Sequence, residues 1–310
     1  MTTLTARSPE DVLAVVPVAL GFEPSDSVVM LTLDARSTFH ARVDLPPDRE
    51  AVPGLVDLLV EPAVRHRARA VVLILYTADD ALARAVARRM ARCGSQARGP
   101  LVVEALRAHD GRWFPLLRDR HGLGATGVSY DVSSHPFIVE AVVEGRVLHG
   151  SRADLAATLR PDPGSVAELD AARDGGAATP GWMVTTLQEW VGGAEPPPPA
   201  VAARLLESAT VPAVRDAAWS VVLRATAREH AHFWQALVRR APDDLVPSAA
   251  AVLALCAWVA GDGALAWCAV DRAREGDPGH SLAALVADLL IGAVAPVDWD
   301  SVRHLLVSAP

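Results

Sequence analysis

The chain has 310 residues and a formal net charge of −8, with 51% hydrophobic and 21% charged residues. This composition is typical of a folded globular protein of about two domains, and the acidic balance argues against a general nucleic-acid binder. Lysine and asparagine are absent, so the 29 residues counted as Lys plus Arg are all arginine. Their absence excludes a Schiff-base lysine, a Walker-type lysine and a Cys-His-Asn triad.

The N-terminus has no basic stretch followed by an apolar one, which predicts that no signal peptide is present. The apolar runs are shorter than the ~18 residues that a membrane-spanning helix needs. We therefore expect a cytoplasmic protein that does not bind membranes. The three cysteines, Cys93, Cys256 and Cys268, are widely spaced, which argues against a disulfide framework and a structural zinc site.

The first 160 residues mix strand and helix patterns. In chain order we expect a helix at 8–20, strands at 27–33 and 38–45, a helix at 50–60, a strand at 69–76, a helix at 77–93, strands at 101–108 and 112–114, and short helices at 136–144 and 151–159. The run at 69–76 is continuously apolar, which predicts a central strand buried on both faces. Residues 1–160 are thus predicted to form an α/β domain, a mixed sheet with flanking helices.

The remaining residues read as a linker followed by helices. Residues 161–199 are rich in Gly, Ala and Pro and end in the run EPPPP, which predicts a linker with a short helix and a stiff spacer. Residues 200–310 are predicted to form an all-α domain. Part of it, residues 249–290, resembles one tetratricopeptide helix-turn-helix unit, whereas a solenoid needs about three, so we expect a tetratricopeptide-like bundle.

Polar residues on two strands are candidates for a ligand site. Tyr76, Thr77 and Asp79 follow the most apolar strand, at the carboxyl end where open α/β sheets gather ligands. Arg42 and Asp44 lie on the polar face of the alternating strand, and arginine suits a carboxylate or phosphate. The competing interpretations are a solvated hairpin face and a helix cap formed by Thr77 or Asp79.

His135 is a further candidate because it follows Ser133 and Ser134 and precedes Pro136. A hydroxyl and an imidazole that lie close in space can act together in acid–base catalysis. Residues that are adjacent in sequence do not by that alone form a catalytic pair. Ser134 as the N-cap of the next helix, with Pro136 near its first position, explains the pattern without catalysis.

Two motifs suggest cofactor or metal chemistry only weakly. Residues 122–127 match GxGxxG, yet the residues that follow look extended rather than helical, which favours a flexible loop over a dinucleotide site. His230 and His232 are two positions apart and point to different sides of a helix, so they cannot easily share one ion. We expect neither a cofactor nor a metal site.

Tryptophans in the predicted helical domain are the candidates for partner binding. Core packing is their commoner role, but tryptophan is also enriched at binding hot spots. The four candidates are Trp219, Trp234, Trp258 and Trp267. Without a coherent catalytic set, we expect a non-enzymatic regulatory or scaffold protein that binds a protein partner.

Two other functions stay open at this stage. One is an enzyme or sensor that binds a small anionic ligand at the strand ends of the α/β domain. The other is weak nucleic-acid binding through an arginine patch between Arg84 and Arg92, which the acidic net charge opposes.

The order of several segments also carries a resemblance. They are SPEDVLAVVPVALGFEPSDSVVML, ARVDLPP, VVLILYTADD, the GRW that ends at Trp113, SSHP, GRVLHGSRADL and AWVAGDGALAWCAVDRAREGDPGHSLAAL. Over nearly its whole length the chain resembles the actinobacterial family named domain of unknown function 4192. The resemblance implies a cytoplasmic actinobacterial protein and supplies no catalytic residues. Family members often carry a cysteine-rich insert after the GRW strand, where this chain has the cysteine-free run RDRHGLGATGVSY.

Overall fold

The computed structural model describes residues 6–35, 39–96, 98–117, 122–176, 178–301 and 303. The chain divides into two compact units, unit 1 (Met1–Ser151) and unit 2 (Arg152–Pro310). Unit 1 is mixed α/β, and the elements described in unit 2 are helical. Within these described ranges, no helix has the length and apolar character needed to cross a membrane.

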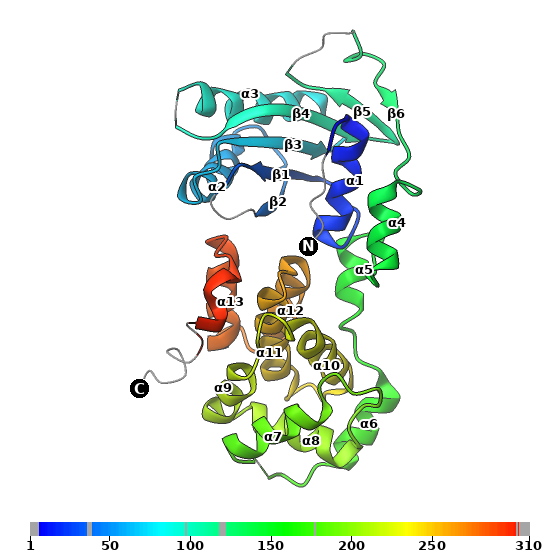
Figure 1. Ribbon diagram of the computed structural model, residues 1–310, viewed down its shortest axis with the longest axis vertical. Helices are drawn as coiled ribbons and strands as arrows, with labels where there is room; N and C mark the ends of the chain where they lie inside the picture. Colours follow the sequence, from blue (N-terminus) through cyan, green and yellow to red (C-terminus); the bar gives the residue numbers. More distant parts are fainter. Residues whose placement is uncertain are drawn as a thin grey trace. The chain divides into compact units, whose positions relative to one another are not determined.

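Unit 1 is built on a mixed sheet whose described strands follow the order β2-β1-β3-β4-β5-β6 (Figure 1). The strands are β1 (Ser27–Leu33), β2 (His40–Asp44), β3 (Ala70–Tyr76), β4 (Leu101–His109), β5 (Arg112–Pro115) and β6 (Val128–Ser129). β3 and β4 are parallel, and the other neighbouring pairs are antiparallel. β3 lies inside the sheet and is buried at its five middle residues, which confirms the prediction of a central strand.

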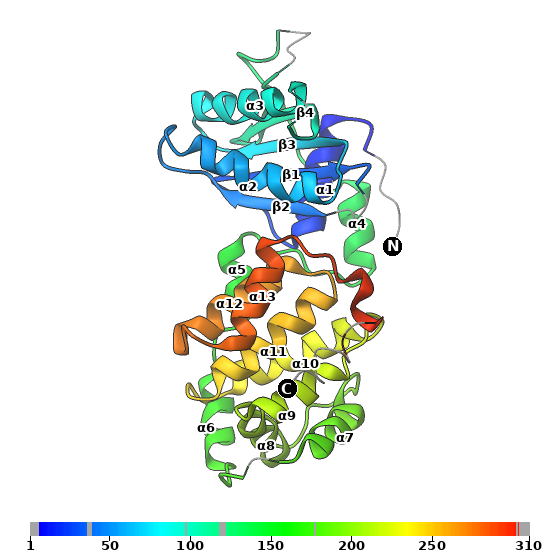
Figure 2. The same cartoon turned by 90° about the vertical axis from the view of Figure 1, so that its left-hand side faces the viewer.

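Helices lie on both faces of this sheet. α2 (Val52–Arg65) and α3 (Asp80–Ser95) lie on one face (Figure 2). They enclose an apolar core with side chains from β1 and β3 such as Met30 and Leu73. On the other face, α1 (Pro9–Leu20) is tied to β5 by a 2.9 Å hydrogen bond that the Trp113 indole donates to Glu10. α4 (Pro136–Val143) packs beside α1 (Figure 1).

The helices of unit 1 begin where local signals place them. α1 begins with a capping box: the Ser8 hydroxyl accepts from the Asp11 amide and the Asp11 carboxylate accepts from the Ser8 amide, both at 3.1 Å. Asp79 caps α3 by accepting from the Leu82 amide at 2.9 Å. At α4 the N-cap is His135 rather than the predicted Ser134.

Unit 2 is an assembly of helices around α11, which is buried along its whole length. Its α-helices are α5 (Arg152–Ala157), α6 (Pro163–Ala171), α7 (Pro180–Trp190), α8 (Pro199–Ala209), α9 (Pro212–Ser220), α10 (Ala227–Arg240), α11 (Val246–Val259), α12 (Gly263–Gly276) and α13 (Ser281–Ile291). α10, α12 and α13 pack against α11. The resemblance of α11–α13 to a tetratricopeptide unit stays a prediction.

Residues 161–199, for which the sequence predicts a linker with a short helix and a stiff spacer, lie within unit 2. The predicted short helix is present as α7, and residues 163–171 form a further helix, α6. The Asp162 amide donates to the Arg239 carbonyl at 2.8 Å, and the Ala178 amide donates to the buried Ser208 hydroxyl at 2.8 Å. Pro163 and Pro180 begin α6 and α7, and Pro199, the last residue of the EPPPP run, begins α8, positions where proline is compatible with a helix.

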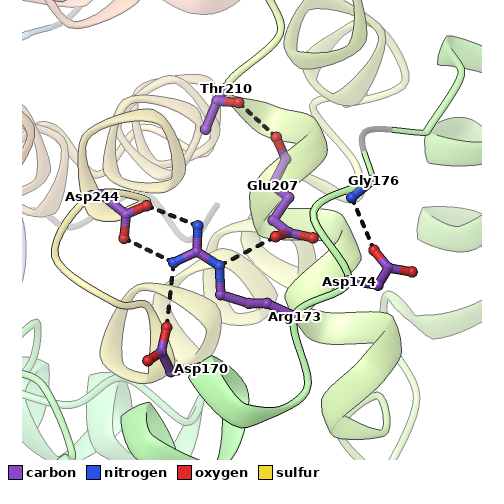
Figure 3. Close-up of polar contacts among 7 residues, drawn as sticks. All are labelled: Asp170, Arg173, Asp174, Gly176, Glu207, Thr210 and Asp244. Carbon is purple, nitrogen blue, oxygen red and sulfur yellow. Dashed lines mark hydrogen bonds and ion pairs between the residues drawn. The ribbon is translucent and has the colours of Figure 1, made fainter.

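Arg173 makes several of the polar contacts that hold residues 161–199 to the rest of unit 2 (Figure 3). Its guanidinium binds both carboxylate oxygens of Asp244, at 2.9 and 3.1 Å, and contacts Glu207 at 3.2 Å and Asp170 at 3.3 Å. Hydrogen bonds to Asp244 and Glu207 stabilise the charged form and raise the pKa of Arg173. Because Glu207 is buried, this arginine neutralises a carboxylate inside the fold.

Candidate functional site

The structure brings the predicted strand-end residues together only in part. Asp44, Ser27 and Tyr76 are neighbours in register across β2, β1 and β3. Directly paired residues share a face, so this polar row lies on the same side of the sheet as α1. Arg42 lies on the same face, but its guanidinium is committed to an ion pair with Asp44 at 2.7 Å and to the Ser25 carbonyl at 3.3 Å.

Thr77 and Asp79 do not join this row. Asp79 caps α3, which packs on the opposite face, and its carboxylate lies 4.0 Å from Arg49. The Thr77 hydroxyl accepts from the Asp79 amide at 3.1 Å and so supports the same turn. The helix-cap interpretation therefore accounts for both residues.

Two residues that the sequence did not single out join Tyr76. Tyr130 and Glu23 act electrostatically on Tyr76, so both tyrosines of the chain lie near one carboxylate. Burial raises the pKa of Tyr76 well above its ordinary value, and burial with Glu23 raises the pKa of Tyr130. Both phenols stay protonated near neutral pH, so they can hydrogen-bond a ligand but cannot serve as bases.

His135 has a structural role that joins α1 to α4. Its Nε2 atom lies 3.1 Å from the Asp11 carboxylate, and its Nδ1 atom accepts from the Phe137 amide at 3.3 Å. Backbone hydrogen bonding from Arg7 and the contact with His135 lower the pKa of Asp11. Both ring nitrogens are thus occupied by contacts of the fold, as expected for a helix cap rather than a catalytic base.

The GxGxxG tract does not have the geometry of a dinucleotide site. Gly127, the last glycine of the tract, is followed by strand β6 rather than by a helix. It has a φ of 63°, and a Cβ atom added there would lie 2.6 Å from the Phe114 ring, so a close approach to that ring explains the glycine. Residues 118–121, the start of the cysteine-free run, lie outside the described residues.

His230 and His232 are separated as the helical spacing predicts. His230 is buried, and this burial lowers its pKa to about 4, whereas His232 is exposed. Among the residues that the structure describes, no group of three or more His, Cys, Asp or Glu side chains is placed to hold a metal ion.

Most of the tryptophans proposed for partner binding lie in the core of unit 2. Trp219, Trp234 and Trp258 are buried, and Trp267 is half-buried. The Trp219 indole donates to Asp216 at 3.0 Å, and the Trp258 indole donates to the Val294 carbonyl at 2.9 Å. Their spacing along helices reflects packing, so the three buried rings do not offer a surface to a partner.

An exposed apolar face occurs instead on α4 in unit 1. Val139, Val142 and Val143 are 50%, 55% and 81% exposed, and Val147, just beyond the helix, is 71% exposed. Only Ala141 of this helix is fully buried. The sequence signal for this exposed face is the run PFIVEAVV, which has more apolar residues than a helix with one buried residue needs for packing.

The arginines predicted as a nucleic-acid patch do not act as one group. Arg84 is paired with Asp80 at 2.7 Å. Arg89 and Arg92 line a cavity with Arg98, a residue beyond the predicted patch. The lining of this cavity comes from α2, α3 and the chain that follows α3, so the run of arginines along one helix did not reveal it.

Comparison with known proteins supplies a family but no activity. A family model described as Domain of unknown function (DUF4192) matches residues 9–297, a range that includes most of both units. No curated protein and no solved structure matches the chain. Since the matched range covers nearly the whole sequence, the chain belongs to the DUF4192 family.

Proposed function

We propose that this protein is a non-enzymatic regulatory or scaffold protein of the cytoplasm that binds a protein partner through the valine face of α4. We define the valine face as Val139, Val142, Val143 and Val147. Its exposure is the observation that carries the proposal, because contiguous exposed apolar surface on a folded protein marks interaction sites.

The spacing of the valine face fits a known mode of recognition. Val139, Val142 and Val143 are related as positions i, i+3 and i+4, so they form one stripe along the helix. A stripe of this kind docks into an apolar groove of a partner. Burying the exposed part of each valine contributes about 1 kcal/mol before the costs of association.

Acidic residues flank the valine face and define the chemistry of the partner. Glu140 and Glu144 are both exposed on the same short helix and its C-cap. Arg146 lies 3.9 Å from Glu144 and partly balances it. We therefore propose a partner groove that is apolar at its centre and carries a basic residue opposite Glu140.

The non-enzymatic part of the proposal rests on the roles of the other candidates. His135 and Asp79 both serve as helix caps, and Arg42 is paired with Asp44. Because these side chains already have structural partners, the alternative of a catalytic or anion-binding site at the strand ends is weaker. They leave Tyr76, Tyr130 and Ser27 as neutral groups there.

The test is a co-purification from the native cells with an α4 double variant, Val142→Asp with Val143→Asp. We expect a stoichiometric partner with the wild-type chain and at least tenfold less of it with the variant, because two charges would be placed in an apolar interface. The control is Leu58→Asp on α2, another apolar residue that is 58% exposed.

Two results would overturn the proposal. One is a partner that the α4 double variant retains while the Leu58→Asp protein also binds it. The other is a purified chain that sediments as a dimer and becomes monomeric with the α4 substitutions, because the valine face would then belong to a second copy. Circular dichroism of the variants checks that the fold is intact.

A further inference from the structure

We propose that a cavity between α2 and α3 is a binding site for a small phosphorylated anion. The cavity measures about 360 Å³ and lies within unit 1. Asp57 and Val60 line it from α2, Arg89, Arg92 and Cys93 from α3, and Gln96 and Arg98 from the chain that follows α3. This site goes beyond the proposed partner surface, which lies on a different helix.

The cavity concentrates positive charge that the protein does not neutralise. Arg89, Arg92 and Arg98 form no ion pair within the part of the chain that the structure describes. Other arginines of unit 1 do have acidic partners: Arg42 with Asp44, Arg65 with Glu61, Arg84 with Asp80, and Arg146 with Glu144. In a chain with 37 acidic and 29 basic residues, three neighbouring arginines without a partner leave a local excess of cations.

Helix electrostatics explain only part of this arrangement. Arg92 lies in the last turn of α3, where the helix dipole favours a cation. The dipole does not account for Arg98, which follows the helix. It does not account for Arg89 either, which lies before the last turn of α3 and lines the same cavity.

The residues that line the cavity indicate which class of ligand it would bind. Three guanidinium groups and the single carboxylate of Asp57 leave a formal charge of about +2, which matches a phosphate dianion. Arginine binds phosphate oxygens bidentately, and the Gln96 amide and the Val60 side chain offer one polar and one apolar contact to the rest of the molecule. The volume is in the range of small-ligand pockets. A duplex nucleic acid needs an extended basic surface instead.

Cys93 provides a reporter inside this cavity. It is half-exposed, whereas Cys256 and Cys268, the other cysteines of the chain, are buried. An alkylating reagent should therefore modify Cys93 first and leave the two buried thiols as internal references. A ligand that fills the cavity will block this reaction.

The experiment measures the rate of Cys93 alkylation by iodoacetamide in the full-length protein, by mass spectrometry, with increasing inorganic phosphate or glycerol phosphate. Sodium chloride of matched ionic strength is the reference. We expect either phosphate compound to slow the reaction at least fivefold while chloride has little effect. Arg89→Gln, Arg92→Gln and Arg98→Gln should each weaken the protection about tenfold, since hydrogen bonds to charged groups are the strong ones.

Two variants make the test specific. Asp57→Asn removes the repelling carboxylate and should strengthen protection severalfold. Arg88→Gln removes the same charge from the same helix at a position outside the lining and should leave protection unchanged. If Arg88→Gln weakened the protection equally, the effect would come from the overall charge of α3, and the proposal would be overturned.

Three further outcomes of the alkylation experiment also test the proposal. No protection by phosphate or glycerol phosphate at tens of millimolar overturns the proposal. So does protection by a short single-stranded oligonucleotide but not by either small phosphate, because the arginines would then serve a nucleic-acid surface. Loss of protection in Arg89→Gln with unchanged circular dichroism excludes unfolding as the cause and supports the site.

Discussion

Arginine serves two opposite purposes in the two units of this protein. In unit 2, Arg173 contacts the carboxylates of Asp170, Glu207 and Asp244, so its charge is neutralised within the fold (Figure 3). In unit 1, Arg89 and its two neighbours face a cavity and have no acidic partner among the described residues. The difference teaches that the surroundings of a charge, rather than its residue type, separate structural arginines from those available to a ligand.

The largest expected effect comes from removing the paired arginine. Arg173→Met should lower the free energy of unfolding by about 3 kcal/mol, because it leaves the buried Glu207 carboxylate without its cation. Urea denaturation followed by circular dichroism measures the change. The control Arg272→Met breaks the Arg272–Glu275 surface pair and should cost less than about 0.5 kcal/mol.

A second substitution in the same network sharpens the interpretation. Arg173→Met combined with Glu207→Met should regain more than half of the lost stability, since no buried charge then stays unpaired. If the double variant is no more stable than Arg173→Met alone, the arginine stabilises the segment through packing of its stem rather than through its charge.

The next effect concerns a buried group of unit 2 that is neutral in the fold. The pKa of His230 is about 4 in the folded state and about 6.5 when unfolded, so the unfolded chain binds the extra proton between these values. The His230 contribution is therefore complete above pH 6.5 and is lost as pH falls toward 4, by about 2–3 kcal/mol.

The matched pair His230→Gln and His232→Gln tests this pH dependence. Denaturation at pH 7 and pH 5 should show a smaller acid-induced loss for His230→Gln than for the wild type. His232 is exposed, so its variant should follow the wild-type curve. Identical curves for both variants would contradict the assignment of His230 as a buried neutral group.

A smaller effect is expected at Gly127, just before strand β6 of unit 1. Gly127→Ala should destabilise unit 1 by about 1–2 kcal/mol, because the position has a positive φ and the new methyl group would clash with the Phe114 ring. Gly122→Ala has a similar φ but open space around it, and it should cost about 1 kcal/mol or less. Thermal unfolding compares the two. Equal shifts would show that backbone strain alone explains Gly127.

The cavity arginines should have the smallest effect on stability. Arg89→Gln and Arg98→Gln should each change the free energy of unfolding by less than about 0.5 kcal/mol, since neither side chain holds an ion pair in the described residues. Urea denaturation without added phosphate measures this. A loss of 2 kcal/mol or more would place these arginines with Arg173 as structural groups and remove the contrast between the units.

Local patterns were sufficient to predict much of the fold. The capping box at Ser8, the alternating strand of β2 and the apolar run of β3 each carry a signal within a few residues, and each element forms where it was expected. In residues 161–199 the predicted short helix is present as α7, whereas the proline and glycine content hid α6. Tertiary contacts such as those of Arg173, which involve residues far apart in sequence, were not visible in that composition.

The candidate sites were less predictable for the same reason. His135 and Asp79 are polar residues at helix starts, and sequence alone could not distinguish a cap from a ligand. Tryptophan suggested an interface, yet burial depends on which helices pack together, and Trp234 is fully buried. The α2–α3 cavity depends on two helices that meet only in the folded chain.

One measurement tests the contrast between the two arginine environments most directly. It compares the unfolding of the wild type and of an Arg89→Gln, Arg92→Gln double variant, each with and without 10 mM inorganic phosphate. Ligand binding stabilises the native state by RT ln(1 + [L]/Kd). We predict equal stability without phosphate, and a gain on adding phosphate in the wild type alone. An unstable double variant, or an equal gain in both proteins, would contradict the account.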